Sequence, residues 1–425
     1  DACKAVVEKP EDENGVSSFQ ALMVSTASRV GTGNIIGVSS AICIGGFGSV
    51  FWMWVIAIIG SASALIESTL AQIYKKKGKD GECYGGPAYY IEAALHCRPL
   101  AIVFCISMIA TYAFGFNMLA SYNLQSTFSG FSFYDTKWTP WIIGGILALI
   151  TGWCLLGGGS RIVKVTSTLV PAMGVAYILI AVIVMIINHA YLPVVFSKIL
   201  SEAFDFQAIF GAFAGSAMMQ GIRRGLYSNE AGIGSAPNAS ASAQVSHPIK
   251  QGLVQMLSVF IDTLLLCTAT AMMCLSSGIA PAQELQGAPW VQAALHESLG
   301  NFGPLFITVA MVLFAFTTLL GNCFYCDNLL NYIHKGQPSK GFMKGFRIVS
   351  SLVVFIGAGM EVSMLWNISD VLMGVMALIN IPVILILSNT ALKALADYEK
   401  QKKDGGNPVF RARDIGLEYE TDYWG

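Results

Sequence analysis

Charged residues are scarce in this 425-residue sequence, at 12% of the chain, whereas hydrophobic residues make up 54%. Soluble domains carry about 25% charged residues. Half that value in a chain of this length excludes an ordinary soluble domain and indicates a protein embedded in a membrane. The net charge of −1 also excludes the basic surface expected of a nucleic-acid-binding protein.

Motifs of catalytic or metal sites are also lacking. The ten cysteines are scattered and lie mostly in apolar segments, where they behave as small hydrophobic residues. The one C-x-x-C pair, Cys323 and Cys326, has no second pair and no histidine nearby, so packing is its expected role. No Ser/His/Asp constellation is recognisable. The sequence therefore predicts no catalytic residue and favours a protein that is not an enzyme.

Long apolar runs, in contrast, are abundant. A helix needs about 20 mostly apolar residues to cross the hydrocarbon core of a membrane. We expect ten spans, at 18–45, 48–74, 99–124, 139–157, 161–188, 207–234, 249–278, 302–333, 343–360 and 364–390. The predicted fold is an all-α membrane protein with ten core transmembrane helices.

Lysine and arginine are distributed unevenly between the connections. If the N-terminus is cytoplasmic, the outer connections hold only Lys137 and Lys198. Three arginines lie within spans, and the other 20 of the 25 basic residues lie on the inner side. Positive charge resists translocation. We therefore expect a multi-pass protein of the plasma membrane, in a bacterial or archaeal inner membrane, with both termini in the cytoplasm.

The first and sixth spans are interrupted by glycine and small polar residues near mid-depth. Span 1 contains "SRVGTGNIIG", and span 6 contains "FAGSAMMQGIRRGLYSNEAGIGSA". The two spans are five apart, so they cross the membrane in opposite directions. Paired interrupted spans indicate an inverted-repeat transporter. The expected organisation is a cytoplasmic segment at 1–17, repeats of five helices at 18–188 and 207–390, an extracellular connector at 189–206 and a cytoplasmic tail at 391–425.

A break in a membrane helix leaves N–H and C=O groups without partners in a region that lacks water. The outer half of span 1 would present the amides of Thr32, Gly33 and Asn34, which suit a carboxylate at a helix N-terminus. The inner half would end near Val30, and the free carbonyls of Ala27 and Val30 suit a cation such as Na⁺. One break thus predicts adjoining sites for an anion and a cation.

Two alternatives remain open at this point. Gly33 and Gly37 have the spacing of a small-residue face that only lets helices pack closely. That interpretation does not explain Arg29 and Asn34 beside them, nor the matching break in span 6. In span 8, the adjacent Thr317 and Thr318 could both face one cation, or each hydroxyl could bond to a carbonyl of its own helix.

Five segments carry a resemblance to a known family: "VGTGNIIGV", "GGPAYYIE", "GLYSNEAGIGSAP", "HPIKQGLVQMLSVFIDTLLLCTAT" and "NPVFRARDIGLEY". They look like signature segments of the alanine or glycine:cation symporter family, whose members resemble the leucine-transporter fold. The similarity extends from about Phe19 to the tail. It implies two inverted five-helix repeats with helices 1 and 6 broken at mid-membrane. Family members typically carry one further helix before the first core span, and the resemblance leads us to expect that this helix is not part of the given sequence.

The resemblance implies a symporter that couples inward Na⁺ flux to the uptake of a small neutral amino acid, and the expected substrate is alanine or glycine. Some members of the family use protons instead. Thr32 and Gly33 would hold the substrate carboxylate through their backbone amides. The residues that would bind Na⁺ are Ala27, Val30, Phe314, Thr317 and Thr318. The candidates in span 6 for contact with the rest of the substrate are Gly215, Ser216, Met219 and Gln220.

This chain departs from the family pattern in span 8. It reads "GNCFYCD" at 321–327, where family members often carry a tryptophan in the second position. If Asn322 faces the substrate, the pocket is roomier and more polar, and glutamine, serine or another small polar amino acid becomes an alternative substrate. If Asn322 turns toward a neighbouring helix, the substrate is unaffected. Both readings stay open.

Ionisable side chains inside a membrane are unfavourable, and each needs a partner. We expect Arg29 to pair with Glu67 or Glu230 and to seal the cytoplasmic side in one conformation. In the competing reading, Glu230 caps and solvates the inner half-helix in a watery vestibule. Asp262 in span 7 is a candidate proton-coupling site or a solvated residue.

The expected mechanism is alternating access, in which Na⁺ steadies the broken span 1 and the substrate binds near mid-membrane. A channel would need a continuous polar pore, which the sequence does not indicate. A sensor would need an output domain, and the tail of about 34 residues is too short for one. The expected partners are a small neutral amino acid, the sodium ion and membrane lipid, without nucleic acid, and a monomer would suffice.

Overall fold

The computed structural model describes the chain except residues 9, 11–14, 79–81, 206–214, 418–420 and 425. The first half of the described chain consists of α1 (Ala2–Val6), α2 (Ser18–Arg29), η1 (Gly33–Gly37), α3 (Val38–Gly45), α4 (Gly48–Ile73), β1 (Lys76–Lys77), β2 (Cys83–Tyr84), α5 (Pro87–Leu95), α6 (Arg98–Ile109), η2 (Ala110–Phe116), α7 (Asn117–Ser126), α8 (Thr139–Leu155), α9 (Gly158–Ile187), η3 (His189–Tyr191) and α10 (Leu192–Ala203).

In the second half, the elements that the structure describes are all helical. It consists of α12 (Ala217–Asn229), α13 (Ala236–Ser240), α14 (Pro248–Val259), η5 (Phe260–Cys267), α15 (Thr268–Leu275), η6 (Gln283–Leu285), α16 (Ala288–Leu299), α17 (Phe302–Ile333), α18 (Lys340–Ala358), α19 (Val362–Lys403) and η7 (Ala412–Ile415). The segments η1, η2 and η5 are π-helical and continue into their neighbouring helices.

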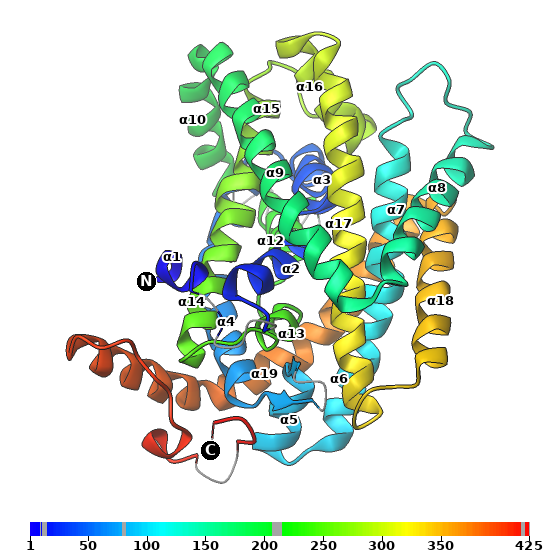
Figure 1. Cartoon of the computed structure of the whole chain (residues 1–425). Helices are drawn as coiled ribbons and strands as arrows, with labels where there is room; N and C mark the ends of the chain where they lie inside the picture. Colours follow the sequence, from blue (N-terminus) through cyan, green and yellow to red (C-terminus); the bar gives the residue numbers. More distant parts are fainter. Residues whose placement is uncertain (9, 11–14, 79–81, 206–214, 418–420, 425) are drawn as a thin grey trace.

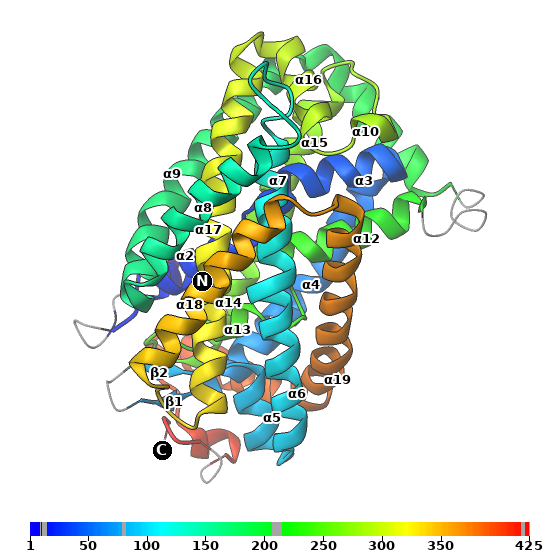
Figure 2. The same ribbon diagram turned by 90° about the vertical axis from the view of Figure 1, so that its right-hand side faces the viewer.

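The helices form an elongated bundle with two distinct ends (Figures 1 and 2). The antiparallel pair β1 and β2, the helix α5 and the C-terminus lie at one end, which we call the sheet side. The helices α10 and α16 lie at the opposite end, which we call the α16 side. These two ends serve below to place the site and its cavities.

Seven helical segments of the described chain are long and apolar enough to cross a membrane: Gly48–Ile73, Arg98–Ser126, Gly158–Ile187, Pro248–Leu275, Phe302–Ile333, Lys340–Ala358 and Val362–Lys403. They coincide with seven of the expected spans. Expected span 1 is divided between α2 and the shorter apolar segment Gly33–Gly45, and span 4 corresponds to the short helix α8. Residues 207–214 of expected span 6 lie outside the described residues. The count of ten spans therefore remains a prediction.

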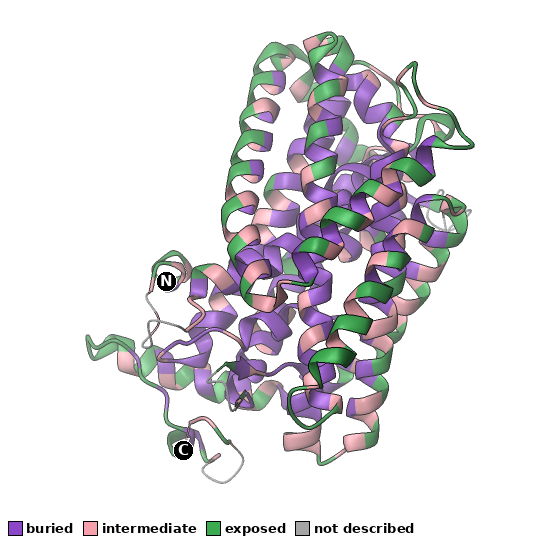
Figure 3. Ribbon diagram, turned by 45° about the vertical axis from the view of Figure 1, so that its right-hand side comes forward, coloured by how far each residue is buried: buried purple, intermediate pink, exposed green. Residues whose placement is uncertain are grey.

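Buried residues run through the middle of the bundle, and exposed residues lie along the outer faces of the peripheral helices (Figure 3). Many of these exposed residues are large and apolar. Leu149 of α8 and Leu378 of α19 are 76% and 78% exposed. Apolar surface of this extent is unfavourable in water and matches the hydrocarbon of a membrane. Inside, α2 packs against α9 and α17, and α4 packs against α12 and α14. Helices from both halves of the chain therefore surround α2.

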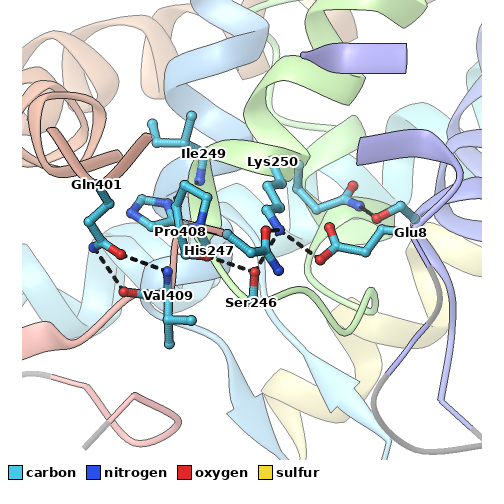
Figure 4. A network of polar contacts seen from close by, with 11 residues as sticks. Glu8, Ser246, His247, Ile249, Lys250, Gln401, Pro408 and Val409 are labelled. Carbon is cyan, nitrogen blue, oxygen red and sulfur yellow. Dashed lines mark hydrogen bonds and ion pairs between the residues drawn. The ribbon is translucent and has the colours of Figure 1, made fainter. Parts of the chain in front are cut away.

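Both terminal segments are tied to the first turn of α14 and to the loop before it on the sheet side (Figure 4). The buried Lys250 Nζ donates to Glu8 Oε1 at 2.7 Å and to Asn407 Oδ1 at 2.7 Å. Ser246 Oγ donates to the carbonyl of Pro408 at 2.8 Å. The helix α19 continues to Lys403, well past residue 390, where we expected its span to end. The tail thus begins as an extension of a helix.

Candidate functional site

The first interruption begins where α2 ends. Arg29 is the last residue of α2, and Val30 leaves the helical conformation with φ −76° and ψ 86°. Helical structure resumes at η1, whose first residue is Gly33. The Gly31 amide donates to Asn34 Oδ1 at 2.9 Å. In an unbroken α-helix this amide would donate to the carbonyl of Ala27. The Ala27 carbonyl is thereby left without its usual helical donor.

Helix α17 crosses the first interruption at close range. A Cβ atom on Gly31 would lie 2.1 Å from Thr318 Oγ1, and one on Gly321 would lie 2.7 Å from the Ser28 nitrogen. Glycine is therefore required at both positions for this approach. Thr318 Oγ1 is buried and has no hydrogen-bond partner among the described residues. A buried hydroxyl without a partner is unfavourable and needs an explanation.

The neighbouring threonine is arranged differently. Thr317 Oγ1 is within hydrogen-bond distance of two carbonyls of its own helix, Leu313 at 3.0 Å and Phe314 at 3.2 Å. Bonding back to the helix was the alternative role for both hydroxyls, and it describes Thr317. Its oxygen still has lone pairs with which it can accept or ligate.

The second interruption lies at the end of α12. This helix is unbroken from Ala217 to Asn229. Glu230 then adopts a left-handed conformation with φ 53°, followed by Gly232 at φ 82° and Gly234 at φ 85°. Only glycine adopts such backbone angles without strain. The chain becomes helical again at α13.

The span 6 candidates lie at the other end of α12. Gly215 and Ser216 precede the helix, and Ser216 Oγ accepts the amide of Met219 at 3.3 Å as an N-cap. Gln220 packs near Gly45, at the far end of α3. The structure does not bring these four residues to the interruption of span 1. The "GLYSNEAGIG" part of the same segment is there instead.

The two interruptions meet through side chains of Ser28 and Glu230. Ser28 Oγ lies 2.9 Å from Glu230 Oε1, and Glu230 Oε2 accepts the hydroxyl of Ser235 at 2.8 Å. A Cβ atom on Gly33 would lie 2.9 Å from the ring of Tyr227. Ser28 and Tyr227 were not predicted as site residues, although both lie within or beside the motifs that identified the two spans.

Asn322 takes part in the same cluster from α17. Its Oδ1 lies 2.7 Å from Ser28 Oγ, and its Nδ2 donates to Asn117 Oδ1 on α7 at 2.9 Å. Asn322 is fully buried. It therefore contacts both the first interruption, through Ser28, and the neighbouring helix α7, through Asn117, and its contact with a substrate stays a prediction.

An aromatic wall borders the cluster. The rings of Phe116 and Tyr227 lie 4.9 Å apart, and those of Tyr227 and Trp366 lie 5.0 Å apart. Arg224 stacks on Trp366 at 4.0 Å and forms two hydrogen bonds with Asp370, at 3.1 and 2.9 Å. Next to this wall, Asn123 Nδ2 donates to Thr32 Oγ1 at 3.0 Å. The start of η1, with its backbone N–H groups, therefore lies beside an aromatic surface.

The expected ion pair of Arg29 is not formed in this structure. Arg29 is buried, and its Nη1 donates to Gln255 Oε1 at 3.2 Å, while its Nε and Nη2 have no partner among the described residues. Glu67 instead accepts the amides of Gly232 at 3.3 Å and Gly234 at 3.2 Å. The carboxylates of Glu67 and Glu230 are thus occupied in holding the second interruption together.

A cavity of about 1300 Å³ opens on the sheet side of these interruptions. Its lining includes Gln20 of α2, Val163 of α9, Asn238 of α13 and Asn328 of α17. These are the helices that surround the two interruptions. A smaller cavity of about 550 Å³ lies on the α16 side and is lined in part by Gln292 and His296.

The sequence is similar to a known family of transporters over nearly its whole length. A model of the sodium:alanine symporter family matches residues 1–412. The amino-acid carrier protein AlsT of Bacillus subtilis is 44% identical over 99% of this chain and 88% of its own length. The sodium/alanine symporter AgcS of Methanococcus maripaludis is 37% identical over 95% of this chain and 89% of its own.

A solved structure supports the fold. The crystal structure of MhsT in complex with L-phenylalanine superposes with a TM-score of 0.59 at 14% identity, over 97% of this chain and 94% of that chain. At this identity the likeness concerns the fold alone. The described helices thus share the leucine-transporter-like architecture that the sequence motifs implied.

Proposed function

This chain belongs to the sodium:alanine symporter family, and we propose that it couples the movement of Na⁺ to the uptake of alanine. It is a multi-pass membrane carrier and not an enzyme. The observation that supports a cation-coupled cycle most strongly is the meeting of Gly31 and Thr318. Here the Gly31 amide has left its usual acceptor, the Ala27 carbonyl, and Gly31 lies against a buried hydroxyl that has no partner among the described residues.

We propose that Na⁺ binds between the end of α2 and α17. Its ligands would be the carbonyls of Ala27, Val30 and Phe314 and the hydroxyls of Thr317 and Thr318. Oxygen ligands suit a hard cation. The buried Thr318 hydroxyl supports this set, because a cation would give its oxygen the partner that the described residues do not. Thr317 can donate its hydrogen to the helix and still offer a lone pair.

The substrate carboxylate would bind at the start of η1. The first N–H groups of a helix have no acceptor within it, and the helix dipole favours an anion there. The amides of Thr32 and Gly33 lie at this point, whereas the Asn34 amide already donates to the Gly31 carbonyl at 3.2 Å. We therefore assign the carboxylate to Thr32 and Gly33.

The small side chain of alanine would face the ring of Tyr227 and the Ser28–Asn322 pair. Gly33 approaches the Tyr227 ring so closely that little space remains there for a larger group. This packing supports a small substrate. Ser216, Met219 and Gln220 stay outside the proposed pocket because α12 carries them toward Gly45.

The cavity on the sheet side supports a cycle of alternating access. We propose that the sheet side faces the cytoplasm of the plasma membrane, because nearly all basic residues outside the spans fall in connections on that side. The structure then represents an inward-facing conformation. Release of substrate and Na⁺ would follow the path between α2, α9, α13 and α17.

A thermal-shift screen of the purified carrier tests the assignment of substrate and ion. A ligand that binds the folded state raises the melting temperature with its concentration. We expect alanine to stabilise the protein with NaCl and to have little effect when KCl replaces it. Equal stabilisation by alanine in both salts would contradict coupling to Na⁺, and the absence of any alanine effect would contradict the substrate.

A further inference from the structure

Asp262 lies in η5, is fully buried and contacts both interruptions. Its Oδ1 accepts Asn34 Nδ2 at 2.7 Å, next to the first interruption. Its Oδ2 accepts Ser228 Oγ at 2.9 Å, two residues before the second interruption. No ion pair of Asp262 is found among the described residues. Its partners are neutral donors, which include the hydroxyl of Thr263 at 2.9 Å.

These contacts extend to the backbone of the first interruption. Asn34 Nδ2 donates to the carboxylate of Asp262 at 2.7 Å and more weakly to its backbone carbonyl at 3.2 Å, and Asn34 Oδ1 accepts the Gly31 amide at 2.9 Å. The Gly31 amide, the Asn34 side chain and the Asp262 carboxylate thus form one chain of hydrogen bonds. The Gly31 amide is the group that would otherwise bond to the Ala27 carbonyl.

The last member of this chain acts as the hydrogen-bond acceptor that sets the direction of the chain. An asparagine amide has an acceptor end and a donor end, and it can face a neutral partner either way round. The carboxylate oxygens of Asp262 accept hydrogen bonds from Asn34, Ser228 and Thr263. Asp262 therefore requires Asn34 to present Nδ2 to it and, as a consequence, Oδ1 to Gly31.

We infer that Asp262 is a positioning residue for Na⁺ binding, acting through Asn34 to hold the Gly31 amide away from the Ala27 carbonyl. Without this restraint, the Gly31 amide can return to the Ala27 carbonyl as an ordinary helical donor. That bond competes directly with a cation for the same oxygen. The inference rests on the proposed Na⁺ site and adds to it a residue that does not touch the ion.

The same carboxylate links this effect to the second interruption. Ser228 is followed closely by Glu230, whose side chain reaches Ser28 in α2. Asp262 therefore contacts the start of η1, through Asn34, and the end of α12, through Ser228, which must keep their relative position while the ion is bound. The two carboxylate oxygens accept hydrogen bonds from Asn34, Ser228 and Thr263 at once. An asparagine at this position has only one accepting oxygen, so the hydroxyls of Ser228 and Thr263 would have to rotate and accept from its amide nitrogen instead.

The test measures the Na⁺ concentration that gives half-maximal thermal stabilisation of the full chain at saturating alanine. Losing a hydrogen bond to a charged group removes about 1.5–3 kcal/mol, so Asp262→Ala should raise this concentration about tenfold or more. Asn34→Ala should have a similar effect. Because both act through the same chain, the double variant should resemble either single variant.

Two further variants separate positioning from other roles. Asp262→Asn keeps an acceptor for Asn34 and should shift the Na⁺ requirement by less than about threefold, since most of the hydrogen-bond chain survives. Thr263→Val removes another donor to the same carboxylate and should change the requirement by less than about twofold, as expected of a substitution away from the chain. The folding of each variant is checked by its melting temperature without Na⁺.

Several outcomes would overturn the inference. If Asp262→Asn were as impaired as Asp262→Ala, the charge itself would matter, as in direct binding of a cation or proton. Additive effects in the double variant, or a normal Na⁺ requirement in Asp262→Ala, would contradict action through Asn34. A wild-type protein that alanine stabilises equally in NaCl and KCl would contradict the proposed function itself, which distinguishes the two failures.

Discussion

The hydroxyl of Thr318 lies directly against Gly31, at the point where α2 gives way to η1. The contact joins a buried oxygen without a partner to a backbone segment that has left the helix. Neither feature is favourable in a protein interior without a ligand. A bound cation between them would satisfy both.

Replacing Thr318 with valine removes the hydroxyl and keeps the shape of the side chain. We expect the half-saturating Na⁺ concentration for alanine uptake to rise about tenfold, since one oxygen ligand contributes about as much as a hydrogen bond to a charge. Thr318→Ser should retain most of the Na⁺ affinity. The measurement is uptake into proteoliposomes over a series of Na⁺ concentrations.

Thr151→Val is the matched control for Thr318→Val. Thr151 is also a buried threonine whose Oγ1 has no hydrogen-bond partner among the described residues, but it lies in α8. Its replacement should leave the Na⁺ requirement unchanged. Equal effects of the two substitutions would show that Thr318 has no particular role in ion binding.

The first interruption and most long helices follow from the sequence, whereas for the second interruption the sequence predicts its existence but not its position within span 6. The apolar runs at 48–74 and 302–333 nearly match α4 and α17, because length and hydropathy suffice for a span. Within span 6, Gly215 and Gly232 are equally plausible breakpoints by composition. The choice depends on Glu67, which is distant in sequence and accepts the amides of Gly232 and Gly234.

Side-chain partners were the least predictable part of the site. Charge alone suggested that Arg29 pairs with an acid, but the structure directs its Nη1 to Gln255. The direction of a side chain depends on the rotation and packing of its helix, which one sequence does not specify. The family resemblance, in contrast, is confirmed for the family and for the leucine-transporter-like architecture, whereas the count of ten core helices stays a prediction.

Asn322 should contribute to stability more than to substrate choice. Both ends of its amide already have partners, in Ser28 and Asn117. Asn322→Ala leaves these groups unpaired and should lower the free energy of unfolding by about 1–3 kcal/mol. Unfolding in detergent measures this, and Asn117→Ala combined with Asn322→Ala should be less than additive.

The same geometry makes a prediction for specificity. Because the Asn322 amide is already bonded, it offers little to a polar substrate, and alanine should inhibit labelled alanine uptake more strongly than glutamine does. Asn322→Ala should preserve that order. If the wild-type protein preferred glutamine and Asn322→Ala lost that preference, the Asn322 side chain would contact the substrate and determine specificity, which would contradict this prediction.

His247 makes the stability of the sheet side depend on pH. It is fully buried outside the spans, beside Asp397 and Lys250, and burial lowers its pKa from 6.5 to about 4. The unfolded chain therefore takes up a proton before the folded chain does, as pH falls below 6.5. Stability from this residue should be complete above pH 6.5, decrease between pH 6.5 and 4, and change no further below pH 4.

The pH effect is measured as the change in melting temperature between pH 7.5 and pH 5. We expect His247→Gln to show a smaller decrease than the wild-type protein. His189→Gln is the control, because His189 is exposed on the α16 side. If His247→Gln and the wild type lost stability in parallel, the protonation of His247 would not be the cause.

The large cavity should be accessible from the cytoplasm. Asn331 lines this cavity, and Ala293 lines the smaller cavity on the α16 side. With the exposed Cys3 replaced by serine, Asn331→Cys should react with a membrane-impermeant maleimide from the cytoplasmic face. Ala293→Cys should react from the outer face. Reaction of the two variants from the opposite faces would contradict the proposed orientation.

The central claim is that one break in the first helix serves both Na⁺ and alanine. The most direct test is the simultaneous uptake of labelled Na⁺ and labelled alanine into proteoliposomes that contain the purified chain. We predict that each solute enters only when the other is present and that the two enter in a constant ratio. Alanine uptake that continues unchanged when K⁺ replaces Na⁺ would contradict the account.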